Sequence, residues 1–285
     1  MTTLIPDAPV RSSRSASAET QPVAGGRSST TRTIGVWGPS GSPGKSTTSI
    51  SLADALVRAG KKVLLVDVDI HNPSLALMLG VMEKSQSLST VLDAMRLNAS
   101  PSLWADLVVP VRTSSGSFDL VAGISSPDRW SEVRFDDLRA LAPFHNLYDF
   151  VVFDMATPVS DTENNRRNGL TLDLLKSVDE LLVLGRPDLV GVQRLAESLL
   201  ELRRIRRDAQ IHLVFNQTSS HGSVGAALDA FELLARERIN AVIARDRRVF
   251  STALAQGTTI SRVRRSGKLQ AQFDALLEQV LTPRL

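Results

Sequence analysis

The sequence predicts an α/β domain with a doubly wound, mostly parallel sheet flanked by helices. Short apolar runs alternate along the chain with amphipathic segments of helical length, and several of these runs end in Asp or Asn. Apolar strands that alternate with helices are typical of parallel sheets covered on both faces. Ligands bind beyond the carboxyl ends of the strands in such sheets, so the polar residues at those ends are the candidate functional residues.

The first half of the predicted domain begins with the short apolar strand Thr33–Trp37. A helix is expected over Ser46–Ala59 because apolar residues recur at helical spacing, and Gly60 suits its C-cap. Apolar runs and amphipathic periodicity then predict the strand Lys62–Asp67, the helix Ser87–Met95, the strand Phe118–Ala122, the helix Phe135–Leu141 and the strand Phe150–Asp154.

The second half continues the alternation. The predicted elements are the strand Glu180–Leu184, the helix Gly191–Arg206, the strand Ile211–Phe215, the helix Ser223–Glu237, the short strand Ala241–Ala244, and the helices Val249–Gln256 and Lys268–Leu281. The last helix carries an apolar stripe at Leu269, Phe273, Leu276, Leu277, Val280 and Leu281. This stripe is expected to pack on the sheet, with contact to a membrane as the less favoured alternative.

Composition limits the class of protein. The chain has 285 residues, 42% of them hydrophobic and 22% charged, which is ordinary for a globular protein. It contains no cysteine, which excludes disulfides and cysteine-ligated zinc or iron–sulfur sites. No apolar run reaches the ~18 residues of a membrane span. The formal net charge of +3 argues against a dedicated nucleic-acid binder but leaves room for a local basic patch.

Two segments are expected. Residues 1–31 are rich in Ser, Thr, Ala and Pro, which predicts a disordered tail. The tail is either simply solvated or, through Arg11, Arg14 and Arg27, a docking segment. It lacks the apolar stretch of a signal peptide, so a cytoplasmic location is expected. Residues 32–285 are expected to form the α/β domain.

A glycine-rich segment between the first strand and the first helix is the main candidate site. Its candidate ligand-binding residues are Gly38, Ser40, Gly41, Ser42, Pro43, Gly44, Lys45, Ser46 and Thr47. Glycines allow backbone N–H groups to turn toward phosphate oxygens, and a helix N-terminus adds a positive dipole end. In such a loop Lys45 would contact the β- and γ-phosphates, and the Ser46 hydroxyl would ligate Mg²⁺.

The loop departs from the usual G-x-x-x-x-G-K-[ST] spacing. That spacing requires glycine at position 39, where the chain has Pro39, and Gly38 comes one residue early. Pro43 also removes one N–H group from the loop. The alternative interpretation is a Gly/Pro turn followed by a serine that caps the helix.

Acidic residues follow two predicted strands. Asp67 and Asp69 lie on the same side if the second strand continues, so one could order a magnesium shell while the other positions an attacking water. Loop or helix-capping aspartates are the alternative. Asp154 follows four apolar residues, a Walker-B-like pattern in which the acid meets Mg²⁺, usually through water. The pattern is weak alone and stronger beside Lys45 and Ser46.

Asn216 follows another buried strand, where its amide could hydrogen-bond an adenine edge with both donor and acceptor. Guanine-specific proteins with this kind of loop carry Asn-Lys-x-Asp at this place. This chain has Asn-Gln-Thr-Ser over residues 216–219. The missing aspartate favours ATP over GTP.

With these motifs in order, residues 33–281 resemble the MinD/ParA family of P-loop ATPases, within the SIMIBI-like class. The resemblance rests on residues 41–48, 63–69, 148–154 and 214–216, and on Asp-Arg-Arg-Val at 246–249 before Gly257. The CpaE/TadZ-like group, which positions pilus machinery, is the most similar.

The resemblance implies a set of roles. Lys45 would bind the phosphates, Ser46 would bind magnesium, and Asp69 would act at the attacking water. Asp67 and Asp154 would lie around the metal, and Asn216 would lie near adenine. Members of the family commonly form homodimers around ATP and switch protein partners or surfaces on hydrolysis.

One departure from the family bears on turnover. Its signature lysine lies five residues before the loop lysine and reaches across the dimer, and that position is Ser40 in this chain. Loss of the cation should weaken stabilisation of transition-state charge. Hydrolysis is then expected to be slow, independent of dimerisation, or supported by another arginine. Ala244 also replaces a proline that many members carry.

Clusters of arginine could hold DNA without sequence specificity, as in ParA-like proteins, or could be a solvated basic face. The clusters are Arg203, Arg204, Arg206 and Arg207; Arg245, Arg247 and Arg248; and Arg262, Arg264 and Arg265.

The function most favoured by the sequence is an ATP-binding, slowly hydrolysing spatial organiser of a pilus, division or segregation apparatus. One alternative is an interaction module that binds nucleotide without hydrolysis, which Pro39, Ser40 and Pro43 favour. Another is a metabolic ligase of the same fold class, for which no substrate-pocket residues can be identified.

Overall fold

The computed structural model describes residues 31–41, 43–81, 87–97, 100–133, 146–157, 166–206, 210–219 and 224–282. The predicted tail up to residue 30, the predicted helix Phe135–Leu141, the loop residue Ser42 and the cluster residue Arg207 lie outside this description.

The described residues form one eight-stranded sheet in the order β3-β4-β2-β5-β1-β6-β7-β8. The strands are β1 (Arg32–Trp37), β2 (Val63–Val68), β3 (Val109–Arg112), β4 (Ser117–Val121), β5 (Phe150–Met155), β6 (Glu180–Gly185), β7 (Gln210–Thr218) and β8 (Ala241–Ala244). All neighbouring pairs are parallel except β3 with β4. The doubly wound, mostly parallel class is therefore confirmed.

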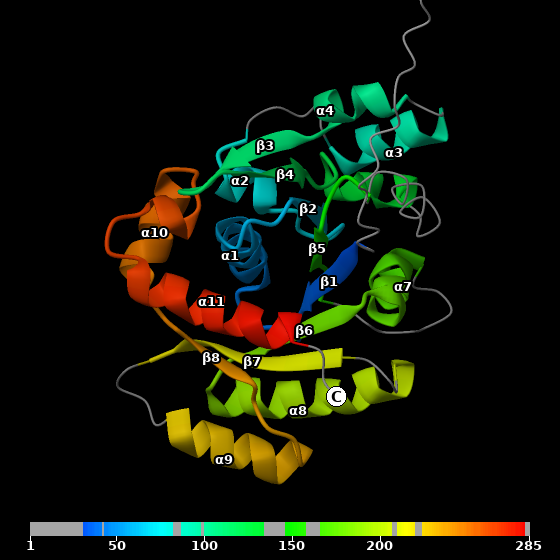
Figure 1. Ribbon diagram of the computed structural model, residues 1–285. Helices are drawn as coiled ribbons and strands as arrows, with labels where there is room; N and C mark the ends of the chain where they lie inside the picture. The colour runs from blue at the N-terminus through cyan, green and yellow to red at the C-terminus, as the bar shows by residue number, and fades with distance from the viewer. Residues whose placement is uncertain are drawn as a thin grey trace, which may run out of the picture.

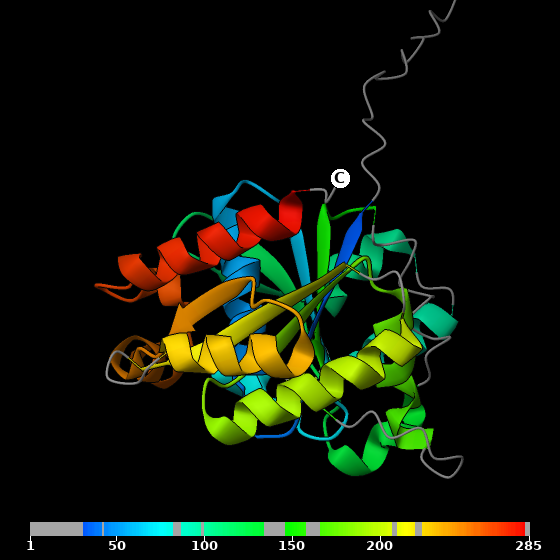
Figure 2. The same cartoon turned by 90° about the horizontal axis from the view of Figure 1, so that it is seen from below.

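Helices cover both faces of the sheet (Figure 1). One face carries α1 (Lys45–Arg58), α2 (Leu75–Met78), α10 (Arg247–Ala255) and α11 (Gly267–Leu281). The other carries α3 (Leu88–Arg96), α4 (Trp104–Leu107), α7 (Gly169–Ser177), α8 (Leu189–Ile205) and α9 (Val224–Ala235). Short 3-10 turns lie at Pro101–Leu103, Pro127–Glu132, Arg166–Asn168 and Ile260–Arg262. Figure 2 shows α8 and α11 on opposite sides of the sheet.

The core has two halves because strand side chains alternate between the faces. In β2, Leu64 and Val66 belong to the apolar cluster on the face of α3, α7 and α8, whereas Val63 and Leu65 belong to the cluster on the face of α1 and α11. All of these strand residues are buried. Burial on both faces explains why the strands are continuous apolar runs in the sequence.

The predicted packing of the last helix is confirmed. Leu269, Phe273 and Leu276 of α11 are buried against the face that carries α1. Among the described helices, none is long and apolar enough to cross a bilayer.

Several expectations need correction. Strand β3 was not predicted, because Pro110 interrupts a four-residue run at the sheet edge. Helix α7 was also not predicted. β7 continues past Asn216 to Thr218 through a register shift, with Gln217 at φ +61°. β2 ends at Val68, so the alternation argument does not extend to Asp69.

Candidate functional site

The glycine-rich segment connects β1 to α1 at the carboxyl end of the central strand. Gly38 is buried, and a Cβ atom there would lie 2.6 Å from the Leu184 carbonyl oxygen, so the backbone of β6 leaves no room for a side chain. Gly41 and Gly44 have φ values of +117° and +86°. Both conformations are unfavourable for residues with a Cβ atom, which explains glycine at these two positions.

Asn216 supports the end of this segment. Its Nδ2 donates to the Pro43 carbonyl at 2.8 Å and to Thr48 Oγ1 at 3.5 Å, and its Oδ1 accepts from the Gln217 N–H. Asn216 is only 4% exposed. The observed role of Asn216 is to hold the loop against β7, and its expected contact with adenine stays a prediction.

Lys45 is the first residue of α1 and reaches the end of β5. Its Nζ donates to Thr157 Oγ1 at 2.6 Å, and Trp37 Nε1 donates to the Thr157 carbonyl at 3.2 Å. Thr157 therefore positions the ammonium group. Thr157 was not among the predicted site residues; its place three residues after Asp154 at a strand end was the available signal.

Hydroxyl groups of α1 surround the buried Asp154. Ser49 Oγ donates to Asp154 Oδ1 at 2.9 Å, while the Ser46 hydroxyl lies near this carboxyl group and accepts from Ser74 Oγ at 2.9 Å. Burial raises the pKa of Asp154 to about 6, although the two hydroxyls and the Lys45 charge act to lower it. Oδ2 of Asp154 is buried and has no hydrogen-bond partner in the described structure.

Asp67 lies beside Asp154, since the two are register partners on neighbouring strands. Its Oδ2 accepts from the N–H groups of Ser74 and Leu75, at 2.9 and 3.0 Å, and its Oδ1 accepts from the Asp69 N–H at 3.1 Å. Burial, and next the charge of Asp154, raise the pKa of Asp67 well above its usual range. Asp67 thus shapes the chain that follows β2.

Asp69 is half-buried in that same chain. Its Oδ1 accepts from the N–H groups of His71 and Asn72, at 3.0 and 2.9 Å. Its charge acts to raise the pKa of Asp154, which places the two carboxylates within electrostatic reach. The bonds that Asp69 makes are therefore those of a loop-capping aspartate.

The donors present fit a magnesium ion that also binds phosphate. Among the described residues, no three acidic, histidine or cysteine side chains converge into a group that could hold a metal ion. The unpartnered Asp154 Oδ2 and the Ser46 hydroxyl are oxygen donors close to one another. Mg²⁺ is usually held by one or two such oxygens, with water and substrate phosphates completing its shell.

Two arginines on the β6 side contact the loop, and sequence reasoning did not single them out. Arg194 Nη1 donates to the Ser40 carbonyl at 3.0 Å, and Arg186 Nη1 donates to the Gly41 carbonyl at 3.5 Å. Both arginines line a cavity of about 260 Å³ beside the loop. Ser40 itself is exposed.

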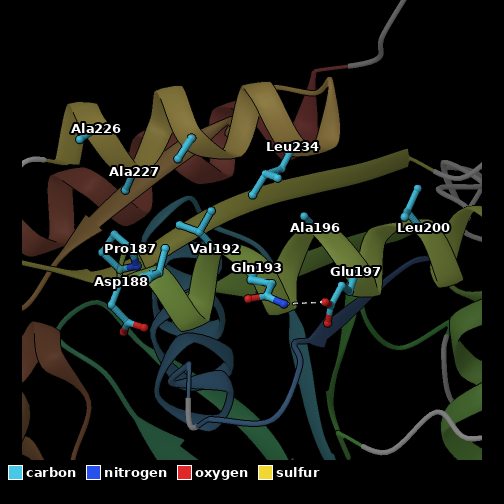
Figure 3. A pocket seen from close by; sticks show the side chains of 12 residues that line it. Pro187, Asp188, Val192, Gln193, Ala196, Glu197, Leu200, Ala226, Ala227 and Leu234 are labelled. Atoms are coloured by element: carbon cyan, nitrogen blue, oxygen red, sulfur yellow. Dashed lines mark hydrogen bonds between the residues drawn. The ribbon is translucent and has the colours of Figure 1, made fainter.

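A separate apolar groove of about 580 Å³ lies between α8 and α9 (Figure 3). Val192 and Ala196 line it from α8, and Ala227 and Leu234 line it from α9. It contains none of the predicted site residues. Asp188, the N-cap of α8, lines both this groove and the cavity beside the loop.

The predicted arginine clusters differ in their contacts. Arg203 forms an ion pair with Glu237 at 3.0 Å, and Arg206 donates to the carbonyls of Leu175 and Asp179. Exposed arginines of the clusters are Arg204, Arg245, Arg247, Arg248, Arg262, Arg264 and Arg265. The first cluster is therefore partly used for packing.

The chemistry of the site follows from these groups. A helix N-terminus, one ammonium group, a hydroxyl and a buried carboxylate with an open oxygen meet beside a glycine loop. Such a set binds a polyphosphate together with a divalent cation.

The chain is similar to known nucleotide-binding proteins. The family model for the CobQ/CobB/MinD/ParA nucleotide binding domain matches residues 34–264. An uncharacterised ATP-binding protein of Methanocaldococcus jannaschii is 26% identical over 224 residues, covering 77% of this chain and 76% of that protein.

Two solved structures are similar in fold. A ParA family ATPase from Chlorobium tepidum gives a TM-score of 0.71 at 21% identity and covers 86% of this chain and 98% of that one. The septum site-determining protein MinD of Pyrococcus horikoshii, complexed with Mg-ADP, gives 0.68 at 21% identity and covers 88% and 96%.

Proposed function

This chain belongs to the CobQ/CobB/MinD/ParA nucleotide-binding domain family, and from that premise we propose that it binds ATP with Mg²⁺ at residues 38–48 and hydrolyses it slowly. One observation carries the proposal. Three groups meet at the N-terminus of α1: Lys45, Ser46 and the open oxygen of Asp154. They lie next to a loop whose conformation at residue 44 requires glycine. This combination supplies backbone donors, a cation and a metal ligand.

In this proposal the ammonium group of Lys45 leaves Thr157 Oγ1 for the β- and γ-phosphates. The Ser46 hydroxyl and Asp154 hold Mg²⁺, with Asp67 behind them as the carboxylate that orders residues 69–75. Asp69 acts at the attacking water through its second carboxylate oxygen, since Oδ1 already caps the loop. Asn216 acts through the loop carbonyl that it holds.

The binding test is a calorimetric titration of ATP with and without Mg²⁺. Lys45→Ala is expected to weaken binding at least about tenfold, because a charge-assisted bond to phosphate is lost. Arg248→Ala is the matched control, because it also removes one positive charge, at an exposed arginine on the first turn of α10. Equal affinity in wild type and Lys45→Ala, or binding that ignores Mg²⁺, would contradict the proposal.

A nucleotide-binding module without turnover is the second candidate. Ser40 offers no side-chain cation, and one carboxylate oxygen of Asp69 is engaged with two backbone N–H groups. Phosphate release from ATP separates the two functions. A wild-type rate of phosphate release that vanishes in Asp69→Ala supports the ATPase. A wild-type rate no higher than that of Lys45→Ala supports the module.

The biological role proposed is a spatial organiser that forms a nucleotide-dependent homodimer and acts with a protein partner on a pilus, division or segregation apparatus. The fold shared with the MinD and ParA structures supports this role. Sizing chromatography with and without a non-hydrolysable ATP analogue tests dimerisation. DNA retention at low and high salt tests the exposed arginines, because phosphate contacts weaken steeply with salt.

A further inference from the structure

The phosphate loop is contacted from outside by two arginines that lie far from it in the sequence. Arg186 directly follows β6, and Arg194 lies in the second turn of α8. Their Nη1 atoms donate to the carbonyls of Gly41 and Ser40, at 3.5 and 3.0 Å. The contact is close, since a Cβ atom on Gly41 would come within 2.9 Å of Arg194 Nη1.

Holding a carbonyl group also fixes the amide that follows it. In a trans peptide the C=O of one residue and the N–H of the next point in opposite directions. Arg194 holds the Ser40 carbonyl on the α8 side, so the Gly41 N–H points away from α8. A glycine at φ +117° has little intrinsic preference to stay in this orientation, so an external contact is needed to fix it.

The loop itself is short of positive groups. Pro43 has no N–H, and Ser40 and Gly41 carry no charge, which leaves Lys45 as the cation within residues 38–48. A guanidinium group has five N–H donors, of which the bond to Ser40 uses one. Both guanidinium groups also line the cavity of about 260 Å³ between the loop and α8, so their positive charge acts on the loop from that side.

The geometry points to Arg194, assisted by Arg186, as the group that selects a triphosphate over a diphosphate at this site. Arg194 orients the Gly41 N–H and brings a second positive charge to the loop. Gly41 lies four residues before Lys45, at the opposite end of the loop from the helix N-terminus. We assign the terminal phosphate to the Gly41 N–H that Arg194 orients, and the arginine charges lie behind that part of the loop backbone. This inference rests on the nucleotide binding proposed above.

The two arginines differ in how firmly they are held. Arg186 Nε also donates to Asp188 Oδ2 at 2.7 Å, and Asp188 Oδ1 caps α8 through the Gly191 N–H. This pairing neutralises much of its charge and fixes its position. Arg194 has the shorter bond to the loop, so it is expected to contribute more to nucleotide selection than Arg186.

The test measures dissociation constants of a non-hydrolysable ATP analogue and of ADP, both with Mg²⁺, by calorimetry on the full chain. Arg194→Ala is expected to weaken the triphosphate about tenfold and ADP by less than about twofold. Arg194→Lys should recover part of the difference because it keeps the charge. Arg204→Ala, an exposed arginine on the same helix, should change neither constant.

Other outcomes are equally informative. Equal weakening of both nucleotides, accompanied by a lower melting temperature without nucleotide, would show a purely structural contact and overturn the inference. Unchanged affinity for both nucleotides would overturn it as well. If the wild-type chain binds neither nucleotide, the proposed function itself fails, which is distinct from a loss confined to the Arg194 variants.

Discussion

Replacement of Gly44 by alanine provides a quantitative test of how the loop is held. Gly44 has φ +86°, and an added Cβ atom would lie 2.5 Å from Asn216 Nδ2 and 3.4 Å from Gln217 Nε2. The left-handed conformation costs alanine about 1 kcal/mol. Displacement of the buried amide breaks its bond to the Pro43 carbonyl, which costs about 1–3 kcal/mol more. The free energy of unfolding should fall by about 2–4 kcal/mol.

Gly60→Ala is the matched control, because Gly60 has φ +74° and no atom within 4 Å of the added Cβ. It should lose only about 1 kcal/mol, since strain acts there without a clash. Urea unfolding of both variants gives the comparison. Combining Gly44→Ala with Asn216→Ala removes the clashing amide, so the two losses should be less than additive. Equal losses for Gly44→Ala and Gly60→Ala would refute the reasoning.

The remaining predictions concern the residues around the phosphate site. Thr157→Val removes the bond that Lys45 Nζ gives up to reach the phosphates, so nucleotide affinity should rise by about fivefold while the free energy of unfolding falls by about 1 kcal/mol, as calorimetry and urea unfolding would measure. Removal of Mg²⁺ with a chelator should weaken ATP binding strongly in wild type but little in Asp154→Ala, because that variant lacks the proposed metal ligand. Equal sensitivity of the two proteins to the chelator would exclude Asp154 from the metal shell. Because burial raises the pKa of Asp154 to about 6, the folded chain without nucleotide holds a proton between pH ~4 and about 6 that the unfolded chain releases. Its free energy of unfolding should therefore decrease as the pH rises through that window, by on the order of 2 kcal/mol, and the decrease should be smaller in Asp154→Asn.

The sequence was sufficient to predict the elements that bury many apolar residues. Strands such as β5 and β6 are continuous apolar runs because helices cover them on both sides, and that pattern is visible without a structure. β3 was not visible because it has four residues, includes Pro110, and lies at an edge where little burial is required.

The site was predictable only where its residues are close in the chain. Lys45 and Ser46 follow the loop directly, so their position follows from the motif. Thr157, Arg186 and Arg194 make contacts with residues 40–45 across more than 100 residues of sequence. Thr157 has only its place after a strand end as a local signal, and no local pattern marks the two arginines. The side chain of Asn216 can lie against the loop only because Gly44 has no Cβ atom, and the spacing of residues in the sequence does not reveal this contact.

Helix α8 connects two parts of the surface as one rigid body. It carries Arg194 against the loop on one side, while Val192 and Ala196 line the apolar groove on another. A hydrogen-bonded helix of 17 residues does not stretch, and each residue advances it by about 1.5 Å. An axial displacement of α8 imposed at the groove would therefore also move the backbone of Arg194, and with it the base from which the side chain reaches the Ser40 carbonyl.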